Sequence, residues 1–147
     1  MELRETLSEE MKTAMKARDE LRLSTIRMIR SAVKNKDIEL KRELADPEIV
    51  EVIATLVKQR RESIRLFSDA GRTDLADKEE RELAVLLGFL PRQLSREEVA
   101  ALVEEAISES GAKGGKDMGK VMKALMPHVA GRADGKMVSD LVKAMLG

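Results

Sequence analysis

Apolar residues recur along most of this chain at the three- and four-residue intervals of an α-helix. No segment shows the sustained alternation of apolar and polar residues that is typical of a half-buried β-strand. The first apolar stripe consists of Leu3, Leu7, Met11, Ala14 and Met15. The pattern therefore predicts an all-α protein.

A second helix is predicted over residues 19–44. Its apolar side is formed by Ile26, Ile29, Val33 and Leu40. A second stripe on the same helix is basic and consists of Arg27, Arg30, Lys34 and Lys41. Such a stripe is most often a solvated helix face, and contact with a polyanion is the alternative.

The next helix has clear signals at both ends. Asp46 is a good N-cap, and Pro47 suits the first helical position, where its missing N–H has no cost. We expect this helix to extend to Ala70 and to end at Gly71 in the left-handed conformation. Thr73 is expected to cap a shorter helix.

The helical pattern is interrupted after that shorter helix. Gly88 ends it, and Pro91 follows in a connecting segment. Ser95 and Glu98 then have the spacing of a capping box, which predicts a helix that ends near Ser108.

The remainder of the chain is predicted to be a loop over residues 111–116 and two short helices over residues 117–126 and 134–146. The predicted domains are a helical-hairpin-like N-terminal part, residues 1–90, and a small three-helix C-terminal bundle, residues 91–147.

The segment from Gly114 to Val121 reads GGKDMGKV and matches seven of the eight positions of the phosphate-binding P-loop. Val121 stands where that motif needs a hydroxyl for Mg²⁺, and the preceding residues predict a helix where a P-loop needs a strand. We therefore predict a helix start, with Val121 in the core and Lys120 facing solvent. Gly119 is expected to permit the close approach of another backbone.

The stretch from Gly131 to Gly135, GRADG, allows two interpretations. Arg132 and Lys136 beside a helix N-terminus are a candidate anion site. Alternatively, Asp134 caps that helix itself and the stretch is only a tight turn, which the local sequence favours. His128 stands alone and is expected to make a local hydrogen bond.

Composition removes several classes of function. The absence of Cys excludes disulfides and thiolate-ligated metals, and no catalytic motif is visible, so no catalytic, cofactor or metal site is predicted. No secretory signal and no membrane-spanning run is seen, which predicts a cytoplasmic protein without a membrane partner. No small-molecule substrate is evident, and a carboxylate pair assembled from separate segments stays open.

The net charge is zero, but basic residues are concentrated in two stretches. Residues 16–42 hold nine basic and four acidic residues, and residues 113–143 hold seven and three. This distribution permits local contact with a polyanion.

Four blocks in order, AGRTDLA, FLPRQLS, MGKVMK and GRADGKMV, make the chain resemble the YqeY family of small bacterial proteins. Members of that family are similar to the C-terminal tail of GatB, a subunit of the glutamine-dependent tRNA amidotransferase. The resemblance implies an all-helical fold. It also implies contact with tRNA, because the tail of the amidotransferase subunit helps to hold the outer corner of the tRNA. Carried over by position, it implies tRNA contacts by Lys120, Lys123, Arg132 and Lys136. The tRNA hypothesis adds Lys116 to this set and takes Arg27, Arg30 and Lys34, from the basic stripe of the second helix, as a second basic patch.

Three hypotheses follow from the sequence. The first is a non-catalytic tRNA-associated adaptor of bacterial translation, which binds folded tRNA through phosphate and shape contacts. The second is a protein-interaction module that docks on an amidotransferase or a translation factor. The third rests on the family label alone: a carbon–nitrogen ligase with glutamine as amido-N-donor, for which no catalytic constellation is visible.

Overall fold

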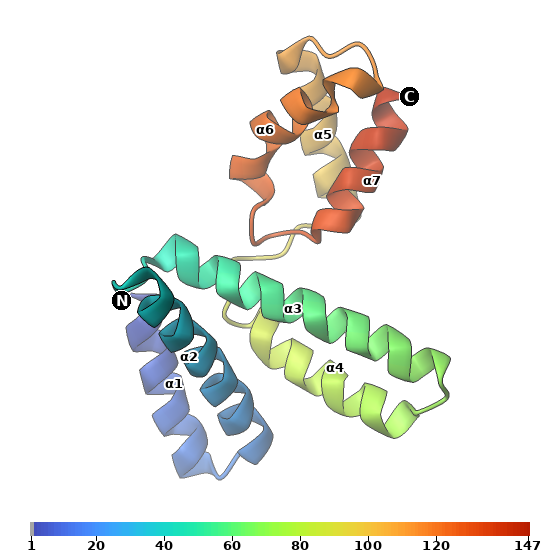
Figure 1. The fold of residues 1–147 in the computed structure, drawn as a ribbon. Helices are drawn as coiled ribbons and strands as arrows, with labels where there is room; N and C mark the ends of the chain where they lie inside the picture. Colours follow the sequence, from blue (N-terminus) through green and yellow to red (C-terminus); the bar gives the residue numbers. More distant parts are fainter. Residues whose placement is uncertain (1) are drawn as a thin grey trace. The chain divides into compact units, whose positions relative to one another are not determined.

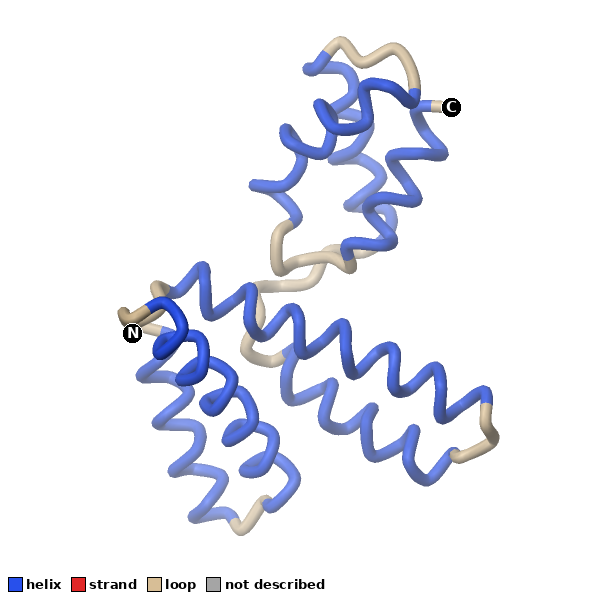
Figure 2. Tube along the Cα trace, in the orientation of Figure 1, coloured by secondary structure: helices blue, strands red, loops and turns tan. Residues whose placement is uncertain are grey.

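The computed structural model describes residues 2–147, and within this range all regular structure is helical (Figures 1 and 2). The prediction of an all-α protein is confirmed. In chain order the helices are α1 (Leu3–Ala17), α2 (Glu20–Leu40), α3 (Asp46–Asp69), α4 (Thr73–Leu87), α5 (Arg96–Ser110), the 3₁₀ turn η1 (Gly115–Asp117), α6 (Met118–Val129) and α7 (Gly135–Leu146).

The chain divides into two compact units between Leu90 and Pro91. The N-terminal unit contains α1 to α4, in which α1 pairs with α2 and α3 pairs with α4 (Figure 1). Its core is formed by Leu7, Ala14, Ile26, Ile29, Val33, Leu44, Ile49, Ile53, Val57, Leu83, Leu86 and Phe89. Because each fully buried aliphatic side chain contributes about 1.5–3 kcal/mol, this core holds the four helices together.

Helix α2 ends earlier than its sequence pattern predicts. It stops at Leu40 because Lys41 takes a left-handed conformation, with φ of 58°. Two residues explain the reversal: the Asp37 carboxylate accepts the Leu44 N–H at 2.8 Å, and Leu44 is buried in the core at 5% exposure. The predicted helix over residues 19–44 was therefore too long, since Leu44 packs from the loop.

The start of α3 is displaced by one residue from the prediction. Ala45 is the N-cap residue, and Asp46 is already helical. The Asp46 carboxylate accepts the Leu3 N–H, while Glu48 accepts the Ala45 N–H at 3.0 Å. Tertiary contact with the start of α1 thus replaces the expected local cap.

The turn between α3 and α4 agrees with the prediction at Gly71 and differs at Thr73. Gly71 has φ of 74°, the left-handed stop expected there. Thr73 is the first residue of α4 and not its cap, since Arg72 occupies the N-cap position and no side chain caps this helix. Arg72 instead pairs with Asp74 at 3.1 Å.

The C-terminal unit packs α5, α6 and α7 around a second core. That core consists of Val99, Val103, Ala106, Val121, Leu125, Val129, Val138, Leu141 and Val142. The predicted capping box at the start of α5 is confirmed: Ser95 Oγ accepts the Glu98 N–H at 3.1 Å, and Glu98 accepts the Ser95 N–H at 3.1 Å. The helix ends at Ser110 and not near Ser108.

Helix α6 continues through a proline. The sequence predicted an end at Met126, but the helix includes Pro127 and ends at Val129. Proline removes one backbone hydrogen bond, and Val129 is only 3% exposed, so burial of Val129 offsets that loss.

Candidate functional site

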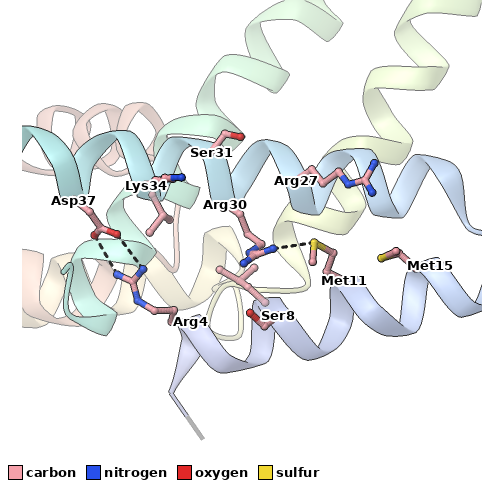
Figure 3. A pocket seen from close by; sticks show the side chains of 11 residues that line it. Arg4, Ser8, Met11, Met15, Arg27, Arg30, Ser31, Lys34 and Asp37 are labelled. Atoms are coloured by element: carbon pink, nitrogen blue, oxygen red, sulfur yellow. Dashed lines mark hydrogen bonds and ion pairs between the residues drawn. The ribbon is translucent and has the colours of Figure 1, made fainter.

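A groove of about 740 Å³ lies between α1 and α2 in the N-terminal unit (Figure 3). Residues from both helices line it: Arg4, Leu7, Ser8, Met11 and Met15 from α1, and Arg27, Arg30, Ser31, Val33, Lys34 and Asp37 from α2. The antiparallel pairing of the two helices makes the groove run along their length.

The floor of this groove is apolar. Leu7 and Val33 are 2% and 3% exposed and belong to the core of the unit. Met11 is half-buried and Met15 is 50% exposed, so both thioether side chains are accessible from the groove. Exposed methionine provides a flexible apolar surface that adapts to different ligands.

Three cations follow one side of the groove on α2. Arg27, Arg30 and Lys34 are exposed, and their spacing of three and four residues places them on one face of the helix over about 10 Å. None of them takes part in an ion pair among residues 2–147. These are the residues that the sequence indicated as a second basic patch.

Arg30 has a neutral contact across the groove. Its Nη1 donates to the Met11 Sδ at 3.0 Å (Figure 3). A thioether is a weak hydrogen-bond acceptor, so this contact orients the guanidinium without neutralising its charge.

The one carboxylate among the described lining residues is already paired. Asp37 accepts two hydrogen bonds from Arg4, at 3.0 and 3.1 Å (Figure 3). It accepts a third from the Leu44 N–H. The Arg4 guanidinium, more than any other group, holds the pKa of Asp37 below its usual range. Asp37 therefore remains ionised and bound to Arg4, and Arg27, Arg30 and Lys34 give the groove a net positive charge.

The C-terminal residues expected to contact tRNA lie in the other unit. Lys116, Lys120, Lys123 and Lys136 are exposed, the first in η1, the next two on α6 and the last on α7. Arg132 is half-buried, and its guanidinium donates to the carbonyl oxygens of Arg92 and His128 at 3.3 and 3.4 Å. Arg132 therefore holds backbone segments of its own unit together.

The two interpretations of GRADG are decided in part. Asp134 occupies the N-cap position of α7, but its side chain makes no capping hydrogen bond. The expectation that the Asp134 side chain accepts hydrogen bonds from the backbone N–H groups in the first turn of α7 is therefore wrong. The turn is held instead by backbone bonds, from Arg132 N–H and Ala133 N–H to the Val129 carbonyl.

The segment that resembles a P-loop is a helix start. Helix α5 precedes it, Val121 is fully buried and Lys120 is exposed, as predicted. The expectation for Gly119 is wrong, because a Cβ at that position would have no atom within 4 Å.

Sequence reasoning missed a charged cluster between α3 and α4. Arg60 Nε lies 2.9 Å from carboxylate oxygens of both Glu79 and Glu82, and its Nη2 donates to the Met28 Sδ at 2.9 Å. All three charged side chains are at most 20% exposed. The sequence signal for this cluster is a pair of acidic residues three positions apart on α4. That signal is weak, because many such pairs on helices face solvent.

Two further kinds of site were searched for. Within residues 2–147, no three His, Cys, Asp or Glu side chains converge in a way that could hold a metal ion. In the same part of the chain, no helix combines the length and apolar character needed to cross a bilayer.

Comparison with known proteins identifies eukaryotic relatives. The chain is 39% identical over 107 residues to "Altered inheritance of mitochondria protein 41, mitochondrial" of Kluyveromyces lactis, a match that covers 70% of this chain and 57% of that protein. It is 31% identical over 145 residues to the protein of the same name in Pyrenophora tritici-repentis, covering 96% of this chain and 79% of that protein. The chain thus spans little more than half the length of the K. lactis relative.

These relatives correct three predictions. The tRNA-associated adaptor is wrong, since the matching proteins are named for mitochondrial inheritance, and neither tRNA nor an amidotransferase appears in those names. The description as bacterial is wrong, because these relatives are eukaryotic. The cytoplasmic location is wrong by the same comparison, because they are labelled mitochondrial.

The resemblance seen in the four sequence blocks is confirmed at the level of the family. The model of the Yqey-like proteins matches residues 4–146, which is nearly the whole chain. The chain therefore belongs to the family of Yqey-like proteins.

Proposed function

We propose that the N-terminal unit is a protein-interaction module whose α1/α2 groove binds an acidic amphipathic helix of a partner protein. One observation carries this proposal: Arg27, Arg30 and Lys34 stand without ion pairs, among the described residues, along an apolar groove. A groove with cations along one side and an apolar floor is complementary to a helix that carries carboxylates on one face and apolar residues on the adjacent face.

The shape of the groove favours a helix over a small molecule. Small-molecule sites enclose most of their ligand, whereas this groove is open and follows two antiparallel helices from Arg4 to Met15. A helix laid along it would present carboxylates at three- and four-residue intervals, the same spacing as the cations of α2.

The two sides of the groove have separate roles in this proposal. Met11 and Met15 provide apolar contact area, which supplies most of the binding free energy. The cations of α2 provide selection for acidic partners and speed their association, because long-range attraction acts before contact. Affinity should consequently fall as ionic strength rises.

The direct test uses a synthetic helical peptide of about 15 residues, with Glu at positions i, i+3 and i+7 and Leu on the adjacent stripe. The double variant Arg27→Glu/Arg30→Glu should bind it at least about 10-fold more weakly, equal to about 1.4 kcal/mol. Fluorescence anisotropy of a labelled peptide, repeated across a salt series, measures this.

The matched control is Lys12→Glu/Lys58→Glu, which changes the net charge equally at two exposed positions that do not line the groove. This control should keep the wild-type affinity within about 2-fold. If both double variants lose affinity equally, or if the wild type binds the peptide no better than a scrambled one, the proposal is wrong.

A further inference from the structure

The contact between Arg30 and Met11 joins a cation to an oxidisable group inside the groove. Arg30 is exposed, Met11 is half-buried, and their Nη1 and Sδ atoms lie 3.0 Å apart. A peroxide that enters the groove can therefore reach the sulfur, because the groove is open along the helices.

We propose that Met11 is a modification site, at which a peroxide forms methionine sulfoxide and the new oxygen holds Arg30 across the groove. The regulation of peptide binding that follows rests on the proposed function of the groove. The change in Arg30 itself does not depend on that function.

The oxidation is balanced as written. A sulfur lone pair of Met11 attacks one oxygen of hydrogen peroxide, so that an S–O bond forms as the O–O bond breaks. The proton on the transferred oxygen passes to the departing hydroxide, which leaves as water. Sulfur is oxidised and the peroxide is reduced.

The product changes the strength of the contact. A thioether sulfur accepts weakly, whereas a sulfoxide oxygen is a strong polar acceptor, and a guanidinium donor makes the bond charge-assisted. Arg30 would then be held on α1 and would no longer be free to meet a carboxylate of the partner helix. The apolar floor would also become polar at Met11.

Two other methionines provide internal comparisons. Met15 lines the same groove and is 50% exposed, but no hydrogen bond joins its sulfur to an arginine among residues 2–147. Met28 contacts Arg60, which Glu79 and Glu82 already hold. Oxidation at either position should leave Arg30 unchanged.

The experiment uses the full chain with Met15→Leu, treated with graded hydrogen peroxide and compared with Met11→Leu/Met15→Leu. Peptide mass spectrometry locates the added oxygen, and ¹⁵N NMR follows the guanidinium signals of Arg30, assigned by their loss in Arg30→Met. Affinity for the acidic peptide of the preceding section is measured on the same samples. Met11→Gln, whose amide oxygen imitates a sulfoxide, is measured without peroxide.

We expect oxygen on Met11, a shifted Arg30 signal and a roughly 5- to 10-fold loss of peptide affinity, all absent from the Met11→Leu/Met15→Leu protein. Met11→Gln should bind weakly before any treatment. An unmodified Met11, or an Arg30 signal indifferent to its oxidation, overturns the inference. If Arg30 responds but even the reduced protein never binds the peptide, the proposed function fails while this modification site stands.

Discussion

Two arginines of the N-terminal unit each donate to a methionine sulfur, one in the α1/α2 groove and one at the edge of the seam between α3 and α4. In the groove, Arg30 donates to Met11 at 3.0 Å, and Arg60 of α3 donates to Met28 of α2 at 2.9 Å. The surroundings differ, because Arg60 has two carboxylates 2.9 Å away while Arg30 is in no ion pair among the described residues.

This difference separates a structural arginine from one that is available to a ligand. Arg60 has a side chain only 20% exposed, so its charge requires partners within the fold. Arg30 is exposed and water satisfies its charge, so the fold does not need a carboxylate beside it. The same kind of Arg–Met contact therefore accompanies a neutralised arginine in one place and orients a free cation in the other.

Removal of the Arg60 charge should have the largest effect on stability. In Arg60→Met, Glu79 and Glu82 lose their shared cation in a largely buried seam, and we expect a loss of about 2 to 3 kcal/mol in the free energy of unfolding. Urea unfolding followed by circular dichroism measures it, since the chain has no Trp or Tyr.

Two further variants test the cause of that loss. Arg65→Met on the same helix removes an exposed arginine and should cost no more than about 0.5 kcal/mol. Adding Glu79→Gln and Glu82→Gln to Arg60→Met should restore at least about half of the loss, because the uncompensated charges are gone. Equal losses in the free energy of unfolding for Arg60→Met and Arg65→Met would show that an arginine in the seam contributes no more to stability than an exposed one.

Acidification should have an intermediate effect, at the Arg4–Asp37 pair that lines the groove. Because Arg4 lowers the pKa of Asp37 below its ordinary value of 3.8, this pair stabilises the fold above that pH. The contribution is lost as the pH falls from about 3.8 through the lower pKa of the folded state. A carboxyl ¹³C NMR titration should place the Asp37 midpoint below 3.8 in the wild type and higher in Arg4→Met. A midpoint unchanged by Arg4→Met would show that another group controls Asp37.

The smallest effect on stability is expected for Arg30→Met. The side chain is exposed and gives up only a thioether contact, so the free energy of unfolding should change by less than about 0.5 kcal/mol. Urea unfolding beside the peptide-binding assay checks both properties, because affinity should fall while stability does not. A loss above about 1.5 kcal/mol would make Arg30 a structural residue like Arg60.

Local signals predicted the helices well where the chain could satisfy them locally. The capping box of Ser95 and Glu98 and the left-handed Gly71 depend on a few neighbouring residues, and both are present. The observed helix ends differ from the predicted ones where a group from a distant part of the chain competes with the local signal. Asp46 binds the Leu3 N–H instead of capping α3, and burial of Leu44 stops α2 before the predicted end.

The candidate site was predictable in part. The spacing of Arg27, Arg30 and Lys34 placed them on one helix face, but it could not show a groove, because the opposite wall comes from α1. The C-terminal set stays a prediction, in which Arg132 differs from the four exposed lysines because it donates to backbone carbonyls of its own unit. Whether an arginine is free or engaged depends on neighbours that sequence spacing does not reveal.

The sequence by itself determined the helical class, the family and most of the apolar face of each helix, because helical periodicity and short motifs are properties of neighbouring residues. Only the tertiary structure decided which charges are neutralised. Arg4 meets Asp37 from 33 positions away, and Arg60 meets two carboxylates from the next helix. Ion pairs depend on distances of a few ångströms between separate helices, and packing alone sets those distances.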